Sequence, residues 1–447
     1  MDVQQFIDRH PFSRFQKQLL VLCFLVVAID GFDTASIGFI APALRAEWQL
    51  SAAALAPLFG AGLFGLMSGA LLLGPLADRY GRKPVLLASV LFFGVASLAS
   101  ACAPNLGTLL ALRFLTGLGL GGAMPSTITL TSEYCPTRQR AGLVTLMFCG
   151  FTIGSALGGL FSAQLLSTIG WRGVLAAGGL LPLLLAPMLW LGLPESLRWL
   201  VLNGRGCVAI KRIMWSIIGA PEQLPMLTVS DVKPAGSPVV QLFRPGLLGG
   251  TVLLWMTFFM SLLIIYLISS WLPTLLNSAG HSLSQASFIS SAFQIGGTLG
   301  AILLGRWMDR FQPQHVLAVA YLGAAACIVL MGLASDSILM LVLAVFGVGF
   351  GVSGSQVGAN ALAAAFYPTA VRATGVSWAS AVGRSGSVVG SLAGGALLAA
   401  KLDNHTIFLM LSVPAVLAAC ALLVMARLGR PAAVAPLHAT PNESLSS

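Results

Sequence analysis

Twelve apolar stretches, each long enough to cross a lipid bilayer, divide this chain of 447 residues. A membrane-spanning helix needs about 20 mainly apolar residues. Windows of that length place the spans at 19–44, 54–77, 84–103, 106–130, 142–166, 171–193, 246–272, 284–307, 315–334, 337–360, 373–399 and 405–426. Only 9% of the residues are charged, against about 25% in soluble proteins. The sequence therefore predicts an all-α polytopic membrane protein.

A polar stretch with several prolines lies between the sixth and seventh spans and divides them six and six. We expect an N-terminal segment (1–18), a six-helix bundle (19–193), a central loop (194–245), a second six-helix bundle (246–426) and a polar tail (427–447). Glycines four residues apart, such as Gly154/Gly158 and Gly390/Gly394, lie on one helix face. Such pairs predict close helix packing in both bundles.

The basic residues are distributed unevenly between the two sides of the predicted membrane. With both termini cytoplasmic, nineteen Lys and Arg residues fall on the cytoplasmic side and three on the other. Because cytoplasmic loops carry the excess of basic residues, this count predicts a multi-pass membrane protein with both termini inside. The net charge of +10 is then a sign of topology and gives no reason to expect nucleic-acid binding.

The two halves repeat one another at a nearly fixed offset. Residues 74–86 align with 305–317 at an offset of 231, and residues 136–140 align with 368–372 at an offset of 232. Both aligned pairs fall on predicted cytoplasmic loops, so the halves have the same orientation and are related by an axis along the membrane normal. This arrangement is typical of alternating-access carriers, which rock two bundles about a central site.

Two aspartates, Asp30 and Asp33, interrupt the first span. A charge at the bilayer centre is penalised by roughly 2.5–3.5 kcal/mol or more, so such residues usually face a polar cavity on an ion or substrate path. Their spacing places both carboxylates on one helix face. We expect them to couple transport to protons, with Arg113 in the fourth span as counter-ion. The alternative is that one of the pair only orders water or bonds to a neighbouring backbone group.

A second set of candidates concerns the transported molecule. Arg384 is the one basic residue deep in the second half, and its planar guanidinium fits a carboxylate through two parallel hydrogen bonds. A structural ion pair across the bundle is the alternative. Polar or amphipathic side chains in apolar surroundings are further candidates for the cavity wall, although hydrogen bonding between helices also explains them. These are Tyr266, Trp271, Gln294, Gln356, Asn360 and Trp378.

Charges of both signs cluster at the predicted cytoplasmic ends of the first half. These residues, Asp78, Arg79, Arg82, Glu133 and Arg140, could form a gate that latches the halves together, and the second half repeats two of them as Asp309 and Arg310. The alternative is that the basic members only fix the topology. The histidines lack metal-ligand spacing, and no nucleophile, base and orienting group occur together. We therefore expect no metal, no cofactor and no enzymatic activity.

Two motifs give the chain a family resemblance. GPLADRYGRK (74–83) resembles the GxxxDRxGRK signature of the major facilitator superfamily, and RFLTGLGLGG (113–122) resembles its fourth-helix motif. DGFDTASIGFIAPAL in the first span and YPTAVRATGVSW before the eleventh are similar to the aromatic acid:proton symporters, most nearly to carriers of 4-hydroxybenzoate and protocatechuate. The resemblance implies twelve helices in two bundles and import of an aromatic carboxylate with protons across a bacterial inner membrane. Carriers of this superfamily mostly function as monomers, so a monomer is expected. It implies coupling roles for Asp30, Asp33 and Arg113.

Three other functions fit the sequence less well than import of an aromatic acid. LPESLRWL (193–200) is also similar to sugar carriers, but the seventh span is mainly apolar and lacks the amide cluster that sugars need. Proton-coupled drug antiporters carry a Gly-Pro step in helix five, and residues 150–159 contain no proline. A non-transporting sensor on a carrier scaffold usually adds a signalling domain, for which the central loop and tail are short. Another organic-anion symporter remains an alternative.

Overall fold

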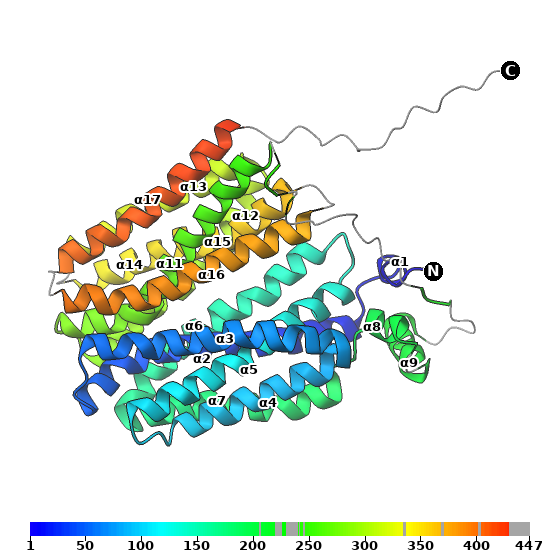
Figure 1. Cartoon of the computed structure of the whole chain (residues 1–447), viewed down its shortest axis with the longest axis horizontal. Helices are drawn as coiled ribbons and strands as arrows, with labels where there is room; N and C mark the ends of the chain where they lie inside the picture. The colour runs from blue at the N-terminus through cyan, green and yellow to red at the C-terminus, as the bar shows by residue number, and fades with distance from the viewer. Residues whose placement is uncertain are drawn as a thin grey trace.

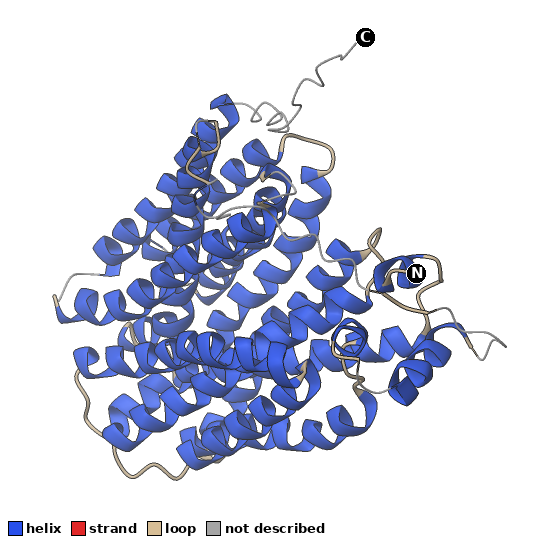
Figure 2. Cartoon of the chain, turned by 45° about the vertical axis from the view of Figure 1, so that its right-hand side comes forward, coloured by secondary structure: helices blue, strands red, loops and turns tan. Residues whose placement is uncertain are grey.

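The computed structural model describes residues 1–204, 207–219, 226–228, 240, 242–244, 246–333, 337–367, 371–400 and 404–428. These residues are almost entirely helical (Figure 2). The first half contains α2 (Arg14–Glu47), α3 (Ala52–Tyr80), α4 (Arg82–Ser100), α5 (Leu106–Tyr134), α6 (Arg140–Thr168) and α7 (Gly170–Gly192). The second contains α11 (Leu248–Ser278), α12 (Leu283–Met308), α13 (Pro313–Leu333), α14 (Ile338–Val348), the π-helical turn η1 (Gly349–Ser353), α15 (Gly354–Phe366), α16 (Arg372–Ala399) and α17 (Asn404–Leu428).

The predicted spans agree with these helices to within six residues at every end, with α14, η1 and α15 forming the tenth. Within the described residues, eleven helical segments are long and apolar enough to cross a membrane. The predicted span that is not among these eleven is 373–399, which is α16, a continuous helix of 28 residues that is rich in serine and glycine and therefore less apolar. The all-α, polytopic fold class is confirmed.

Glycines allow the paired helices of each half to approach closely. A Cβ on Gly154 of α6 would collide with the backbone of Ala28 on α2, and a Cβ on Gly390 of α16 would collide with the backbone of Leu263 on α11. The pairs α2–α6 and α11–α16 occupy equivalent places in the repeat. The glycine spacing therefore has the packing role that the sequence predicted.

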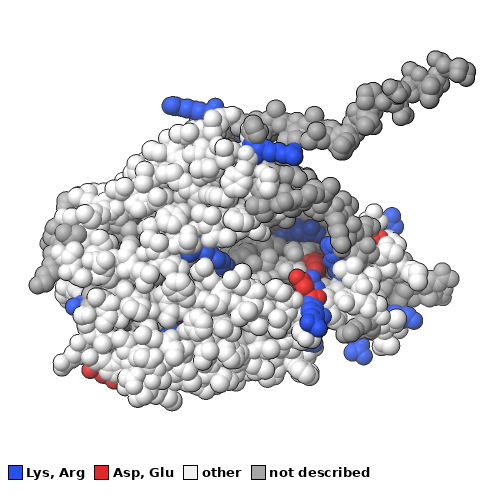
Figure 3. All heavy atoms as spheres, viewed as in Figure 1, with Lys and Arg blue, Asp and Glu red and all other residues white. Residues whose placement is uncertain are grey.

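The two halves touch at one end and separate at the other (Figure 1). At the closed end, Arg45 donates a hydrogen bond to Ser278 at 3.3 Å, the rings of Phe59 and Trp271 are 4.9 Å apart, and Gly38 lies against the backbone of Ser269. At the other end, the surface is hollowed between the halves, and charged side chains gather at the rim (Figure 3). We call this the open end.

Three short helices at the open end were not predicted. These are α1 (Val3–Asp8), α8 (Leu197–Leu202) and α9 (Cys207–Ile218). Val3, Phe6 and Ile7 of α1 are buried. Asp2, which directly precedes α1, forms an isolated β-bridge with Thr228. The predicted polar tail beyond residue 428 lies outside the described residues.

Candidate functional site

A buried ion pair joins α2 to α5 in the middle of the first half. Arg113 Nη1 lies 3.1 Å from Asp33 Oδ2 and 3.3 Å from Asp33 Oδ1, and both side chains are at most 4% exposed. Ser97 of α4 donates a hydrogen bond to Asp33 Oδ1 at 2.7 Å. The structure therefore brings the predicted counter-ion to Asp33.

Hydroxyl groups hold the other side of the guanidinium. Arg113 Nη2 donates to Ser97, Ser100 and Thr116 at 3.0, 3.2 and 3.1 Å. Arg113 is thus fixed by hydroxyls of α4 and of its own helix as well as by Asp33. The sequence analysis missed these three hydroxyl residues.

Asp30 lies one turn before Asp33, and its surroundings differ. It is 2% exposed, and it accepts a hydrogen bond from Thr34 at 3.2 Å. No Lys or Arg of the described chain lies within ion-pair distance of Asp30. Arg384 of α16 lies close enough to Asp30, and to Tyr266 of α11, to interact electrostatically with both. Asp30 therefore has no cation of the described chain at ion-pair distance, whereas Asp33 has Arg113.

Arg384 is half-buried and forms no ion pair with a carboxylate of the described residues. A guanidinium without a carboxylate partner in the described chain, with the half-buried aromatic side chain of Tyr266 in its surroundings, is suited to a planar anion. The structural ion pair considered as an alternative is not seen for Arg384 in the described part of the chain.

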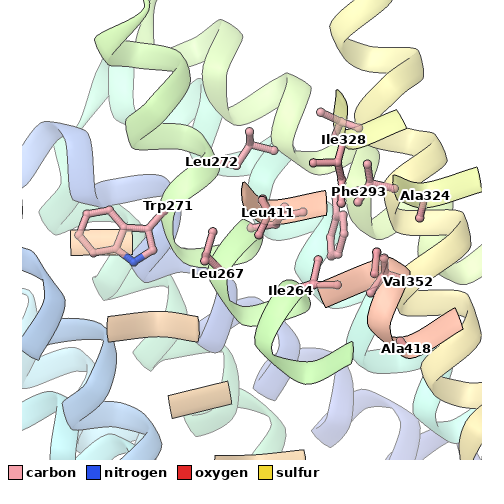
Figure 4. Packing of buried hydrophobic residues seen from close by; sticks show 14 of the residues in the cluster. Ile264, Leu267, Trp271, Leu272, Phe293, Ala324, Ile328, Val352, Leu411 and Ala418 are labelled. Carbon is pink, nitrogen blue, oxygen red and sulfur yellow. The ribbon is translucent and has the colours of Figure 1, made fainter. Parts of the chain in front are cut away.

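The remaining wall candidates lie at different depths. Trp271 is fully buried at the closed end, where its indole donates to Ser391 O at 2.7 Å. Figure 4 shows it on the opposite side of α11 from the second-half core around Phe293 and Ile328. Trp271 therefore reaches toward the first half.

Two candidates lie nearer the open end, and two more are partly or fully buried. Trp378 is 42% exposed and stacks on Trp255, with ring centroids 5.9 Å apart, and Asn360 is exposed. Gln356 is half-buried with an unpartnered amide oxygen. Gln294 is buried and reaches Ser269 at 3.4 Å. The structure therefore does not bring all six wall candidates together around a single site.

The charged cluster of the first half forms a connected network at the open end. Arg82 pairs with Asp78 at 2.9 Å and lies 3.8 Å from Glu133. Glu195, just before α8, accepts hydrogen bonds from the backbone amides of Arg82 and Lys83 at 2.8 and 3.3 Å. This carboxylate caps the N-terminus of α4, whose N-cap residue, a glycine, has no side chain to do so. The hydroxyl of Ser196 joins the network by donating a hydrogen bond to Glu133. The sequence analysis did not identify Glu195.

The other gate candidates make fewer contacts. Arg79 lies over the ring of Tyr80 at 5.4 Å, and the Nε atom of Arg140 is buried without a partner. Asp309 and Arg310 are exposed and form no ion pair among the described residues. The repeat explains the difference, because the positions equivalent to Arg82 and Glu133 hold Pro313 and Ala365.

Comparisons with known proteins agree with this architecture. A model of the Major Facilitator Superfamily matches residues 23–283 and 254–445. The chain is 46% identical over 429 residues to the 4-hydroxybenzoate transporter PcaK of Pseudomonas aeruginosa, covering 95% of each protein. It is 48% identical over 440 residues to a gallate transporter of Pseudomonas putida, covering 98% of each. Its fold is similar to the inward open xylose transporter XylE from E. coli, with a TM-score of 0.72 at 19% identity, covering 94% of this chain and 97% of that one.

Proposed function

Because the chain belongs to the Major Facilitator Superfamily, we propose that it is a proton-coupled symporter that imports small aromatic carboxylates by alternating access. The resemblance predicted from the sequence motifs is confirmed, and the family is one of transporters and not of enzymes. Its relatives transport 4-hydroxybenzoate and gallate by name. We place the protein in a bacterial inner membrane as a monomer, with the open end and both termini in the cytoplasm, as the distribution of basic residues favours.

The observation that carries the proposal is the unequal surroundings of the two aspartates. Asp33 has Arg113 at 3.1 Å and can remain ionised at low dielectric. Asp30 is equally buried without a cation at ion-pair distance, and an isolated charge there is costly, so Asp30 is the better proton carrier. We therefore assign proton binding to Asp30, and to Asp33 with Arg113 a fixed charge pair beside it.

Arg384 links the proton to the substrate. While its charge is free, Arg384 would favour the ionised form of Asp30, because a nearby opposite charge stabilises a carboxylate. When a substrate carboxylate neutralises Arg384, that favourable field is lost, and Asp30 holds a proton more readily. Thermodynamic linkage makes the effect reciprocal, so protonation of Asp30 also strengthens binding of the carboxylate to Arg384. Proton and anion then load together, as symport requires.

The other candidate residues receive roles consistent with their positions. Trp271 with Phe59 would close the outer end, and Trp378, Gln356 and Asn360 would line the path to the cytoplasm. Asp78, Arg79, Arg82, Glu133, Arg140, Asp309 and Arg310 would hold the halves together when the open end closes.

Transport in proteoliposomes tests the proposal. Labelled 4-hydroxybenzoate should accumulate with an inward pH gradient and only equilibrate without one. Asp30→Asn should retain exchange of substrate between the two sides but lose gradient-driven accumulation. Arg384→Ala should weaken substrate binding about 10-fold or more, because hydrogen bonds to charged groups contribute about 1.5–3 kcal/mol, whereas Arg384→Lys should retain part of the affinity. Accumulation independent of the gradient would contradict the coupling.

A further inference from the structure

A small cavity between the halves contains polar groups that the symport mechanism does not use. It lies between α2, α11 and α12 and is lined by Ala35, Phe39, Ile268, Ser269, Ser290, Phe293 and Gln294. The empty space within these walls, including its opening, is about 220 Å³, and only about one water-sized group fits fully inside. The cavity is thus apolar in most of its lining, with three polar side chains grouped at α11 and α12.

These polar side chains are incompletely paired. Ser290 is 7% exposed, and its hydroxyl has no hydrogen-bond partner in the described structure. Gln294 is 5% exposed, and its amide nitrogen reaches Ser269 only at 3.4 Å. Buried polar groups are nearly always hydrogen-bonded in folded proteins. An unpaired hydroxyl beside an amide, both lining this space, can therefore donate to and accept from a polar group placed there.

The cavity lies at a suitable depth relative to the proposed anion site. Ala35 is five residues beyond Asp30 on α2, about 7.5 Å along the helix, and Ser269 is three residues beyond Tyr266 on α11, about 4.5 Å. A benzoate whose carboxylate is bound by Arg384 near Asp30 and Tyr266 would direct the far end of its ring toward the cavity. Phe39 and Phe293 supply apolar walls for that end.

We propose that Ser269, Ser290 and Gln294 form a subsite for a hydroxyl group on the ring of the aromatic acid, so that the carrier selects hydroxylated benzoates over benzoate. The inference rests on the proposed function and specifies its substrate class. A phenolic hydroxyl both donates and accepts, and a serine hydroxyl with an amide can satisfy both roles. Because the walls come from α2 as well as α11 and α12, a substrate that fills the subsite also contacts both halves.

Direct binding to purified full-length protein tests the subsite, with 4-hydroxybenzoate and benzoate titrated separately by calorimetry. Wild-type protein should bind 4-hydroxybenzoate more tightly. Ser290→Ala should reduce that affinity about 10-fold while changing benzoate affinity less than about 2-fold, because only the hydroxylated ligand loses a partner. Ser269→Ala should shift the ratio in the same direction.

Ser287→Ala is the matched control. Ser287 lies on the same helix and is also buried with an unpartnered hydroxyl, but it does not line the cavity. This variant should leave the ratio of the two affinities unchanged. An unchanged ratio in both Ser290→Ala and Ser269→Ala, or an equal change in Ser287→Ala, would overturn the subsite, as expected if the cavity only holds a structural water. Wild-type protein that binds neither acid would instead overturn the proposed function.

Discussion

Replacing each aspartate of α2 by asparagine should separate a fixed charge from a proton carrier. Asp33→Asn removes the carboxylate that neutralises Arg113, which is 2% exposed. Breaking a buried ion pair by removing one partner costs about 3–5 kcal/mol. Since Ser97, Ser100 and Thr116 still accept from the guanidinium, we expect a loss near the lower limit, about 3 kcal/mol.

Asp30→Asn should behave differently. The amide oxygen can still accept from Thr34, and the variant leaves no cation of the described chain without its ion-pair partner. We expect a change in stability below about 1 kcal/mol, within the range of ordinary substitutions. Asp30→Asn should therefore remain folded while losing proton-driven accumulation.

Thermal unfolding in detergent, followed with a thiol-reactive dye, measures both effects. Cys23 and Cys149 are free and buried, so their labelling reports unfolding of the first half. The double variant Asp33→Asn with Arg113→Met provides the control, because removing the orphaned charge should recover part of the loss. Equal stability of the two single variants, or greater loss in Asp30→Asn, would refute the distinction between the aspartates.

Three further substitutions test particular contacts. Glu195→Ala removes the carboxylate that caps α4 and should lower the free energy of unfolding by about 1–2 kcal/mol, with a smaller loss for Glu195→Gln in the same thermal assay. Gly38→Val would collide with the backbone of Ser269, so spin labels at 45 and 278 should move apart; an unchanged distance would show that this contact does not hold the closed end. Burial raises the pKa of Asp8, but hydrogen bonds from Thr137 outweigh it and hold the pKa below its ordinary value of 3.8. The stabilisation is therefore present at neutral pH and lost as pH falls below that value, and Asp8→Asn should expose the N-terminal segment to protease at pH 7 but add little at pH 3.

The twelve spans could be predicted because the bilayer imposes a length and an apolar composition on every crossing helix. Short helices have no such signal. α1 has only six residues, and isolated helices of that length are unstable in water. Its formation depends on the burial of Val3, Phe6 and Ile7 against the first half, which the sequence alone does not reveal.

The charged part of the site was predictable for a similar reason, since Asp33 and Arg113 are conspicuous in apolar spans. The hydroxyls around them were not. Serine and threonine occur throughout the spans, and many, such as Ser126 and Thr127, bond only to their own helix. Residue type therefore cannot distinguish Ser97, which bonds to Asp33, from these neighbours. Nor could a spacing of three residues show which aspartate has the cation.

The asymmetry between the repeats has a consequence for coupling. Positions equivalent to Asp30, Asp33 and Arg113 hold Leu262, Ile265 and Val345 in the second half, so the repeat supplies no second proton site there. The second half contributes Arg384, whose charge reaches Asp30 across the interface. In the proposed mechanism, the proton affinity of Asp30 depends on the distance between the halves, which rocking changes, and on whether Arg384 holds an anion. One carboxylate can therefore respond both to substrate and to the direction in which the carrier is open.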